Sequence, residues 1–346
     1  MIEYQQGNLL ETKADALVNT VNCVGIMGKG IALQFKQAFP ENFKQYERAC
    51  KNNQVHTGKM FVVATGRLFP PKYLINFPTK KHWKGKSKIA DIQNGLADLV
   101  NEVQQLGITS IAIPPLGCGN GGLNWSEVKP LIESAFAQLP NVRVIIFEPT
   151  GAPIAANMTV SSQTPNMTRA RALFIRLLEL YGIVGYELTK LEIQKLAYFL
   201  QESGEPLKLS YEKHLYGPYA HNLNHVLRNI EGHFIRGYGD GTGKGQIYVL
   251  PQGREAATAF LDNDLEAIQR LERVSNLISG FETPYGLEML ATVHWVATKY
   301  EQPAQDIEQA ISLFQEWNPR KKKIFKPDHI RIAWHQLQEQ NWFLKP

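Results

Sequence analysis

The chain has 346 residues, of which 44% are hydrophobic and 20% charged, and a formal net charge of +5. This length predicts two domains, each large enough to bury a core of its own. No apolar run approaches the roughly 18 residues that a membrane-spanning helix needs, and the first residues lack the basic and apolar parts of a secretory signal. We therefore expect a cytoplasmic protein that makes no contact with a membrane.

The first half of the chain alternates short β-branched runs with stretches whose apolar residues recur every three or four positions. We expect strands at residues 2–6, 16–20, 60–64, 73–77, 110–113 and 142–147. We expect helices at residues 31–39, 41–50, 89–106 and 126–139. Such alternation predicts an α/β sandwich with a largely buried sheet and a ligand at the strand ends.

Residues 151–168 carry no charge and are rich in small, Ser, Thr and Pro residues, which is the composition of a linker. The predicted domains are therefore residues 1–150 and 169–346. In the second domain we expect a small hairpin within residues 235–250 and otherwise helices. The expected helices cover residues 172–181, 190–202, 219–230, 254–260, 265–279, 284–300 and 329–340.

The excess positive charge lies in the first domain. Residues 1–150 contain 16 Lys and Arg against 11 Asp and Glu, whereas the rest contains 21 of each kind. No acidic residue interrupts the stretch from Arg67 to Asp91. Its lysines are Lys72, Lys80, Lys81, Lys84, Lys86 and Lys88. This run favours a polyanionic ligand, because phosphates release counterions when they bind Lys; a solvated lysine-rich loop is the alternative.

The three cysteines, Cys23, Cys50 and Cys118, are an odd number without a C-x-x-C pair. This argues against a disulfide framework and against a zinc site. We expect free thiols and no bound metal.

Two glycine-rich segments each follow a predicted strand and precede a predicted helix. The first glycine segment contains Gly25, Gly28 and Gly30, and the second runs from Pro114 to Trp125. Glycines allow a close approach of backbone amides to a phosphate, and two such segments at one sheet edge indicate a diphosphate held from both sides. Neither segment fits a P-loop or a Rossmann fingerprint, which argues against ATP hydrolysis and hydride transfer.

The order of G-N-L near the N-terminus, L-V-N-T-V-N-C-V-G-I-M-G-K-G from Leu17 to Gly30 and P-P-L-G-C-G-N-G-G-L from Pro114 to Leu123 resembles macrodomains. Within them it is most similar to the DarG group of DNA ADP-ribosyl glycohydrolase antitoxins and to terminal ADP-ribose glycohydrolases. The resemblance covers residues 1–149. It implies the α/β macrodomain fold, a mixed sheet sandwiched by helices, and ADP-ribose as the ligand.

The resemblance also implies the positions of ligand contacts. Asn8 and Leu9 would meet the adenine, Thr20, Val21 and Asn22 the distal ribose, and the residues from Gly117 to Gly121 the phosphates. The full expected set is Asn8, Leu9, Thr20, Val21, Asn22, Met27, Gly28, Lys29, Gly30, Ile31, Thr79, Gly117, Cys118, Gly119, Asn120 and Gly121.

A third motif, I-N-F-P-T-K-K-H-W from Ile75 to Trp83, is similar to the strand end where these enzymes carry a catalytic lysine, and Lys80 is the matching residue. A lysine at the scissile N-glycosidic bond can act as an acid, stabilise charge or attack C1″ when neutral. We favour acid or electrostatic assistance. Some relatives place an aspartate just after G-C-G, where this chain has Asn120 and Gly121, and this departure fits removal of ADP-ribose from DNA better than from acyl links on protein.

In the second half, Lys190–Leu200 and the Y-G-P-Y turn around Pro218 resemble antitoxin domains of the Panacea and SocA-like group. This implies a mainly α-helical domain that neutralises a toxin by binding. We expect the toxin to be a DNA ADP-ribosyltransferase, met by an acidic surface that imitates DNA. The expected acidic residues are Glu255, Asp262, Asp264, Glu266, Glu272, Glu282 and Glu288, against Arg270 and Arg273.

The predicted function is therefore an antitoxin that hydrolyses ADP-ribose from ADP-ribosylated single-stranded DNA, needs no cofactor and separately binds its toxin. One alternative is a reader that binds ADP-ribose without turnover. The other is a hydrolase that acts on protein or on small ADP-ribose esters. The two glycine segments and the lysine run fit all three interpretations.

Overall fold

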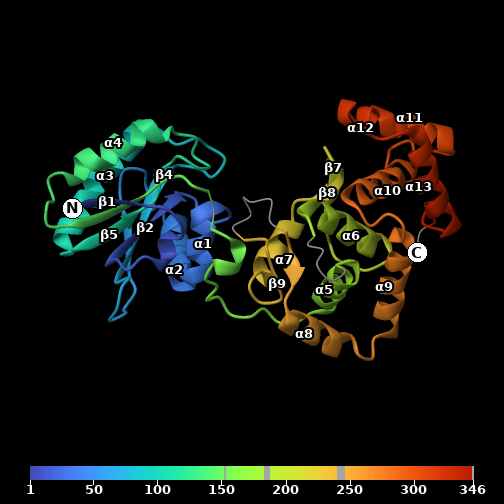
Figure 1. Cartoon of the computed structure of the whole chain (residues 1–346), viewed down its shortest axis with the longest axis horizontal. Helices are drawn as coiled ribbons and strands as arrows, with labels where there is room; N and C mark the ends of the chain where they lie inside the picture. Colours follow the sequence, from blue (N-terminus) through green and yellow to red (C-terminus); the bar gives the residue numbers. More distant parts are fainter. Residues whose placement is uncertain (152, 183–187, 240–245, 345–346) are drawn as a thin grey trace. The chain divides into compact units, whose positions relative to one another are not determined.

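The computed structural model describes residues 1–151, 153–182, 188–239 and 246–344. The chain divides into two compact units, of which the first contains Met1–Gln163 and the second most of the chain from Thr164 onward. In Figure 1 the first unit is coloured blue to green and the second green to red. In the part of the chain that the structure describes, no helix has the length and apolar character needed to cross a membrane.

The first unit is built on a six-stranded mixed sheet in the order β1-β6-β5-β2-β4-β3. All neighbouring strands are parallel except β3 and β4, which pair antiparallel. The strands are β1 (Ile2–Gln5), β2 (Ala16–Asn22), β3 (Phe61–Ala64), β4 (Tyr73–Lys80), β5 (Ser110–Ile113) and β6 (Arg143–Phe147). The predicted mixed sheet is confirmed.

Helices cover both faces of this sheet (Figure 1). They are α1 (Gly30–Ala38), α2 (Pro40–Lys51), α3 (Ile89–Gln105) and α4 (Trp125–Phe136). Alternate residues of each strand point to opposite faces, so Ile111 and Ile113 join the core under α3 and α4. Ala112 joins the core on the other face, together with Phe35 of α1.

The two strands that lead into the site are longer than predicted. We expected them to end at Thr20 and Phe77, but β2 continues to Asn22 and β4 to Lys80. The extra residues pair with each other, Val21 with Pro78 and Asn22 with Lys80. Pro78 is tolerated because the antiparallel pairing with β3 covers only Tyr73–Asn76, so no partner on that side needs its missing N–H group.

The greater part of the predicted linker, up to Gln163, belongs to the first unit, whereas residues 164–168 belong to the second. Ala155–Asn157 form a short 3-10 helix, and the side chain of Met158 is buried. The backbone N–H of Ser161 donates to the carbonyl of Gln37 in α1 at 2.8 Å. The chain therefore stays in contact with the first unit beyond residue 150.

The second unit is mainly helical, as predicted. Its helices are α5 (Arg169–Tyr181), α6 (Lys190–Glu202), α7 (Leu223–Ile230), α8 (Pro251–Leu261), α9 (Leu265–Ile278), α10 (Pro284–Thr298), α11 (Ile307–Glu316), α12 (Pro319–Ile324) and α13 (Pro327–Glu339). Its two hairpins pair β7 (Tyr211–His214) with β8 (Gly217–Ala220) and β9 (Ile235–Arg236) with β10 (Tyr248–Val249). Helix α10 lies in the core, since ten of its fifteen residues are buried.

Two features of this unit differ from the prediction. The helix expected from residue 219 begins at Leu223, because Gly217–Ala220 pair with Tyr211–His214 in a hairpin. Helices α11 and α12 were not predicted. The middle of the predicted hairpin at 235–250 falls partly outside the described residues, and only its ends, β9 and β10, are assigned.

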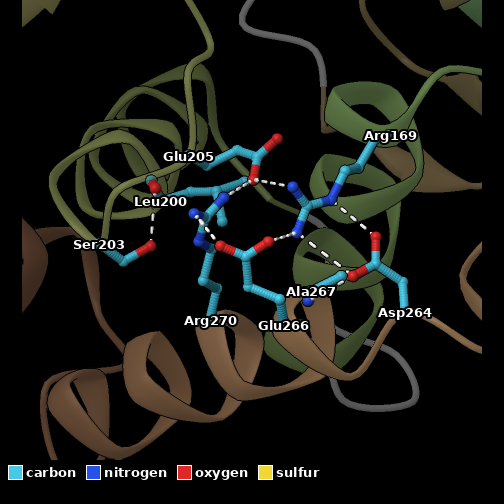
Figure 2. Close-up of polar contacts among 8 residues, drawn as sticks. All are labelled: Arg169, Leu200, Ser203, Glu205, Asp264, Glu266, Ala267 and Arg270. Carbon is cyan, nitrogen blue, oxygen red and sulfur yellow. Dashed lines mark hydrogen bonds and ion pairs between the residues drawn. The ribbon is translucent and has the colours of Figure 1, made fainter.

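An arginine and carboxylate network joins α5, α9 and the segment after α6 (Figure 2). Arg169 pairs with Asp264 at 2.7 Å and with Glu266 at 2.9 Å. Glu205, whose side chain is 3% exposed, lies between Arg169 and Arg270 and pairs with both. These ion pairs offset the cost of burying the Glu205 carboxylate and hold the three segments together.

Candidate functional site

The structure brings both glycine segments and Lys80 to one edge of the sheet. Strand β2 lies between β5 and β4, and all three run parallel. Their carboxyl ends therefore meet, which is where open α/β sheets bind ligands. The first glycine segment follows β2, the second follows β5, and Lys80 ends β4.

The first glycine segment is held in shape by Asn22. The side-chain oxygen of Asn22 accepts from the N–H groups of Val24 at 2.9 Å and Ile26 at 3.4 Å. The hydroxyl of Tyr46 in α2 donates to the carbonyl of Asn22 at 2.6 Å. The Asn22 side chain is buried and committed to this turn, so it fixes the path of the backbone beside the site.

Helix α1 begins directly after this segment and points its first N–H groups at the same edge. Gly30 has a φ of 61°, a conformation that a residue with a side chain rarely adopts. The residue before it, Lys29, is extended and makes no side-chain capping hydrogen bond. The unpaired N–H groups of the first turn can therefore bind an anion such as a phosphate.

The second glycine segment folds around Ser87. A Cβ on Gly121 would lie 2.3 Å from the carbonyl oxygen of Gly117 and 2.4 Å from the Ser87 hydroxyl, so this position has no room for a side chain. The N–H of Ser87 donates to the carbonyl of Gly121 at 3.0 Å. By contrast, a Cβ on Gly119 would meet no atom within 4 Å. The segment thus presents an open surface at Gly119 and a closely packed one at Gly121.

Lys80 bridges β4 and the second glycine segment. Its ammonium donates to the carbonyl of Asn120 at 2.8 Å, and in the sheet Lys80 pairs with Asn22 of β2. Partial burial lowers the pKa of Lys80, because removing water disfavours the charged form. The predicted catalytic lysine and the predicted ligand segments are therefore neighbours.

Several predicted contact residues have side chains in the protein core. Leu9, Val21 and Met27 are 2–3% exposed, and Thr79 is buried with its hydroxyl donating to the carbonyl of Val21 at 3.4 Å. Only the backbone of these residues can face a ligand. The predicted residues with at least partly exposed side chains are Asn8, Thr20, Lys29, Ile31, Lys80, Cys118 and Asn120.

Two pockets flank this edge and include residues that the sequence did not single out. One, of about 330 Å³, is lined by Gly7, Asn8, Glu11 and Thr150 and by Gly151, Pro153, Ile154 and Asn157 of the predicted linker. The amide of Asn8 donates to the carbonyl of Asn157 at 3.5 Å. The other pocket, of about 450 Å³, is lined by Cys23, Asn53, Val55, His56, Thr57 and Lys81.

All three cysteines are free, as predicted. Burial raises the pKa of Cys23 and of Cys118 to about 11, so both are protonated at neutral pH. Neither thiol is suited to nucleophilic chemistry, which leaves Lys80 as the reactive group best placed at the meeting point of the two glycine segments.

Comparison with known proteins agrees with this geometry. A family model described as Macro domain matches residues 18–132. A DNA ADP-ribosyl glycohydrolase of Thermus aquaticus is 49% identical over 333 residues, which cover 96% of this chain and 92% of that protein. The chain belongs to the DNA ADP-ribosyl glycohydrolase family. In this member of the family, the matched macrodomain region contains both glycine segments and Lys80.

Two further proteins are similar to part of this DNA ADP-ribosyl glycohydrolase family member. The solved macrodomain of Mycobacterium tuberculosis DarG is 58% identical, with coverage of 43% of this chain and 99% of that one and a TM-score of 0.43. A DNA ADP-ribosyl transferase-DNA ADP-ribosyl glycohydrolase fusion protein of Thermosipho africanus is 37% identical over 142 residues, which cover 37% of each chain.

Proposed function

We propose that the first unit hydrolyses the N-glycosidic bond between ADP-ribose and a base of single-stranded DNA, with Lys80 as the catalytic residue. The observation that carries this proposal is the position of Lys80, between Asn22 of β2 and Asn120 of the second glycine segment. The names of the full-length relatives support DNA as the carrier of the modification.

ADP-ribose is placed along the sheet edge in this proposal. Its adenine lies near Asn8 and Leu9, its diphosphate between the first turn of α1 and the open surface at Gly119, and its distal ribose beside Thr20. The diphosphate is neutralised by backbone N–H groups and by Lys29, which is exposed at the start of α1. C1″ of the distal ribose then lies within reach of Lys80.

Hydrolysis breaks the bond between C1″ and a nitrogen of the base. The bonding electron pair leaves with the base, which gains a proton, while water forms the new bond to C1″ and loses a proton. Lys80 assists by donating a hydrogen bond or a proton to the departing base. The lowered pKa of Lys80 favours this role, because a more acidic ammonium releases its proton to the departing base more readily.

Replacement of Lys80 by alanine tests the assignment. We expect Lys80→Ala to reduce the release of ADP-ribose from an ADP-ribosylated oligonucleotide by about 10²- to 10⁴-fold. The affinity for free ADP-ribose, measured by calorimetry, should change by less than about threefold, because the glycine segments hold the diphosphate. Near wild-type turnover in Lys80→Ala would rule out the assignment.

The same assay separates the alternatives. A reader of ADP-ribose would bind the wild-type ligand with no turnover of the oligonucleotide. A hydrolase of protein links or small esters would act on an ester-linked substrate and leave the oligonucleotide intact. Both substrates should therefore be compared at equal concentration.

We further propose that the second unit binds and inhibits a DNA ADP-ribosyltransferase toxin. Support comes from the Thermosipho africanus relative, whose name combines a transferase and a glycohydrolase in one polypeptide. One residue of the expected acidic surface is not at the surface in the structure. Glu288 is buried and pairs with Arg320 and Lys321, so it cannot contribute.

The remaining acidic surface lies on and beside α8 and α9. Asp264 and Glu266 pair with Arg169, which reduces their charge toward a partner. Among the described residues, the members of the expected set that are exposed and make no ion pair are Glu255, Asp262, Glu272 and Glu282. An acidic surface of this kind can occupy the phosphate-binding groove of a DNA-modifying enzyme.

This second proposal is tested with the toxin and two charge variants of the full chain. Glu255→Lys with Asp262→Lys should weaken the complex in a pull-down at moderate salt and abolish the rescue of growth in a Lys80→Ala background. Glu41→Lys with Glu47→Lys, which changes one exposed and one partly exposed acid of α2 in the first unit, is the control of equal charge change. Equal effects of the two pairs would contradict binding through α8 and α9.

A further inference from the structure

The chain that follows Lys80 forms an exposed basic segment, residues 81–88. Its four lysines, Lys81, Lys84, Lys86 and Lys88, are all exposed. Among the described residues, none of them makes an ion pair, whereas Lys59 and Lys72 of the same unit pair with Asp98 and Asp15. The charge of the basic segment is therefore available to an external anion.

Both ends of the basic segment are attached to the glycine segments. The carbonyl of Lys81 accepts from the N–H of Cys23 at 3.1 Å, and the N–H of Ser87 donates to the carbonyl of Gly121 at 3.0 Å. Between these ends, the N–H of Gly85 donates to the carbonyl of His82 at 2.9 Å and closes a turn. The lysines thus lie at a defined place beside Lys80.

An aromatic surface lies at the centre of the basic segment. Trp83 is 46% exposed although it is the largest side chain of this turn. The ring of His82 lies 5.4 Å from that of Trp83, and the ammonium of Lys84 lies 5.0 Å from the Trp83 ring centre. A tryptophan that remains this exposed offers a stacking surface for a flat group such as a base, and the lysines beside it can contact negative charge linked to that group.

A pocket adjoins the basic segment at Lys81. It measures about 450 Å³, and Asn53, His56 and Thr57 supply polar groups to its lining. Lys80 and Lys81 therefore lie at different parts of the surface. Lys80 donates to the second glycine segment, whereas Lys81 lines this pocket. The surface next to the scissile bond is continuous from Lys80 to a basic and partly concave region.

We infer that the basic segment binds the DNA strand on both sides of the modified base. In this inference Trp83 stacks on a neighbouring base, and the lysines contact backbone phosphates. It rests on the proposed function, because a base attached to C1″ beside Lys80 must bring its strand past residues 81–88. Stacking on tryptophan together with lysine contacts to phosphates is the chemistry that binds single strands without sequence preference.

The consequence is a preference for long substrates. An ADP-ribosylated nucleoside presents the same scissile bond and the same ADP-ribose but has no flanking phosphates or bases. The basic segment should therefore lower KM for an ADP-ribosylated oligonucleotide and leave the hydrolysis of the nucleoside unaffected.

The test compares these two substrates in three variants of the full chain. Trp83→Ala should raise KM for the oligonucleotide by about 5- to 150-fold, the range that loss of one base stack produces. Lys84→Gln with Lys86→Gln and Lys88→Gln should reduce the slope of log KM against log salt by about 2, since each lost phosphate contact on a single strand contributes about 0.7. Lys44→Gln with Lys51→Gln, two exposed lysines of α2 paired with glutamates, is the control.

The expected pattern is a change in KM for the oligonucleotide alone, with kcat and all nucleoside constants within about twofold of wild type. Equal losses on both substrates, or no loss on either, would overturn the inference. If wild-type protein hydrolysed neither substrate, the proposed function would fail instead. In that case the inference can still be tested by fluorescence anisotropy, which measures the affinity for an unmodified single-stranded oligonucleotide. Equal affinity of wild type and the triple lysine variant would overturn the inference by itself.

Discussion

Lys80 in the first unit and Lys195 in the second both have a pKa that burial lowers, but their surroundings differ. Lys80 lies at an open sheet edge and donates to the carbonyl of Asn120 at 2.8 Å. Lys195 is 1% exposed, donates to the carbonyl of Pro218 at 2.6 Å and has a pKa of about 7. Its neighbour Lys321 is fully buried, with a pKa of about 8.

This comparison shows that a lowered lysine pKa does not identify a catalytic group. Lys321 donates to Glu288 at 2.8 Å and to the hydroxyl of Thr292 at 3.0 Å, within a closed core. No substrate can approach it there. Lys80 is less buried and lies beside both glycine segments, so accessibility is what distinguishes this proposed catalytic lysine from Lys195 and Lys321.

The largest effect expected from the buried cluster is on stability. Lys321→Ala leaves the Glu288 carboxylate buried with Arg320 as its remaining cation, so we expect a loss of about 3 kcal/mol in the free energy of unfolding. Urea unfolding followed by tryptophan fluorescence reports mainly this unit, because four of the six tryptophans lie there: Trp295, Trp317, Trp334 and Trp342.

Lys322→Ala is the matched control, since this lysine is exposed on the same helix α12. It should change the free energy of unfolding by less than about 0.5 kcal/mol. Hydrolysis by folded Lys321→Ala should equal wild type at low temperature. An equal loss of stability in both variants, or a specific loss of turnover in Lys321→Ala, would contradict a purely structural role.

A smaller effect is expected at the open edge of the first unit. In Gly119→Val the new side chain meets no protein atom within 4 Å, so it extends into the space assigned to the diphosphate. We expect the Kd for ADP-ribose to rise by about 10- to 100-fold, as for the loss of one or two charge-assisted hydrogen bonds. The free energy of unfolding should stay at the wild-type value.

Gly121→Val gives the opposite pattern. Its side chain would overlap the carbonyl of Gly117 and the hydroxyl of Ser87, so thermal stability should fall together with affinity. Calorimetry and thermal unfolding of both variants distinguish the two surfaces of the segment. Unchanged ADP-ribose affinity in folded Gly119→Val would place the diphosphate elsewhere.

The last expected effect is a pH dependence of the stability of the second unit. Burial lowers the pKa of His294 to about 3, and its ring contacts the hydroxyl of Tyr198 at 2.7 Å and the carbonyl of Trp342 at 3.0 Å. Between pH 6.5 and 3 the unfolded chain binds a proton at this residue and the folded chain does not. Stability therefore falls as the pH falls through this range, by up to about 1.4 kcal/mol per unit.

Both histidines of the first unit, His56 and His82, are exposed, so acid should unfold the second unit first. His294→Gln removes the titrating group, and its free energy of unfolding should depend less on pH between 6 and 4 than that of wild type. Parallel pH profiles for the two proteins would show that other groups control acid unfolding.

The order of elements in the first unit followed from local patterns. Short apolar runs such as residues 111–113 predict strands of a largely buried sheet, and the structure confirms this, because these three residues join cores on both faces. The ends of β2 and β4 were predicted too short, because Val21, Asn22 and Lys80 become strand only through pairing with each other. Local propensity contains no information on such pairing.

In the second unit, local sequence patterns also failed to predict pairing and burial. Residues 219–222 have helical periodicity, yet Tyr219 and Ala220 pair with β7. Glu288 looked like part of an acidic helix face, although it is buried with Lys321. A carboxylate that is solvated and one that is buried beside a cation have the same local sequence, so only packing against distant segments separates them.

The sequence by itself determined the residue types of the site: two glycine segments after strands, a lysine at the end of another strand and a lysine-rich stretch beyond it. These follow from short-range patterns and from a specific family resemblance. Only the tertiary structure decided which of these groups lie together and which remain accessible, because parallel pairing sets the common edge of β5, β2 and β4. The side chains of Leu9, Val21 and Met27 are buried and cannot contact a ligand. Lys80, Gly119 and Trp83 remain accessible to one.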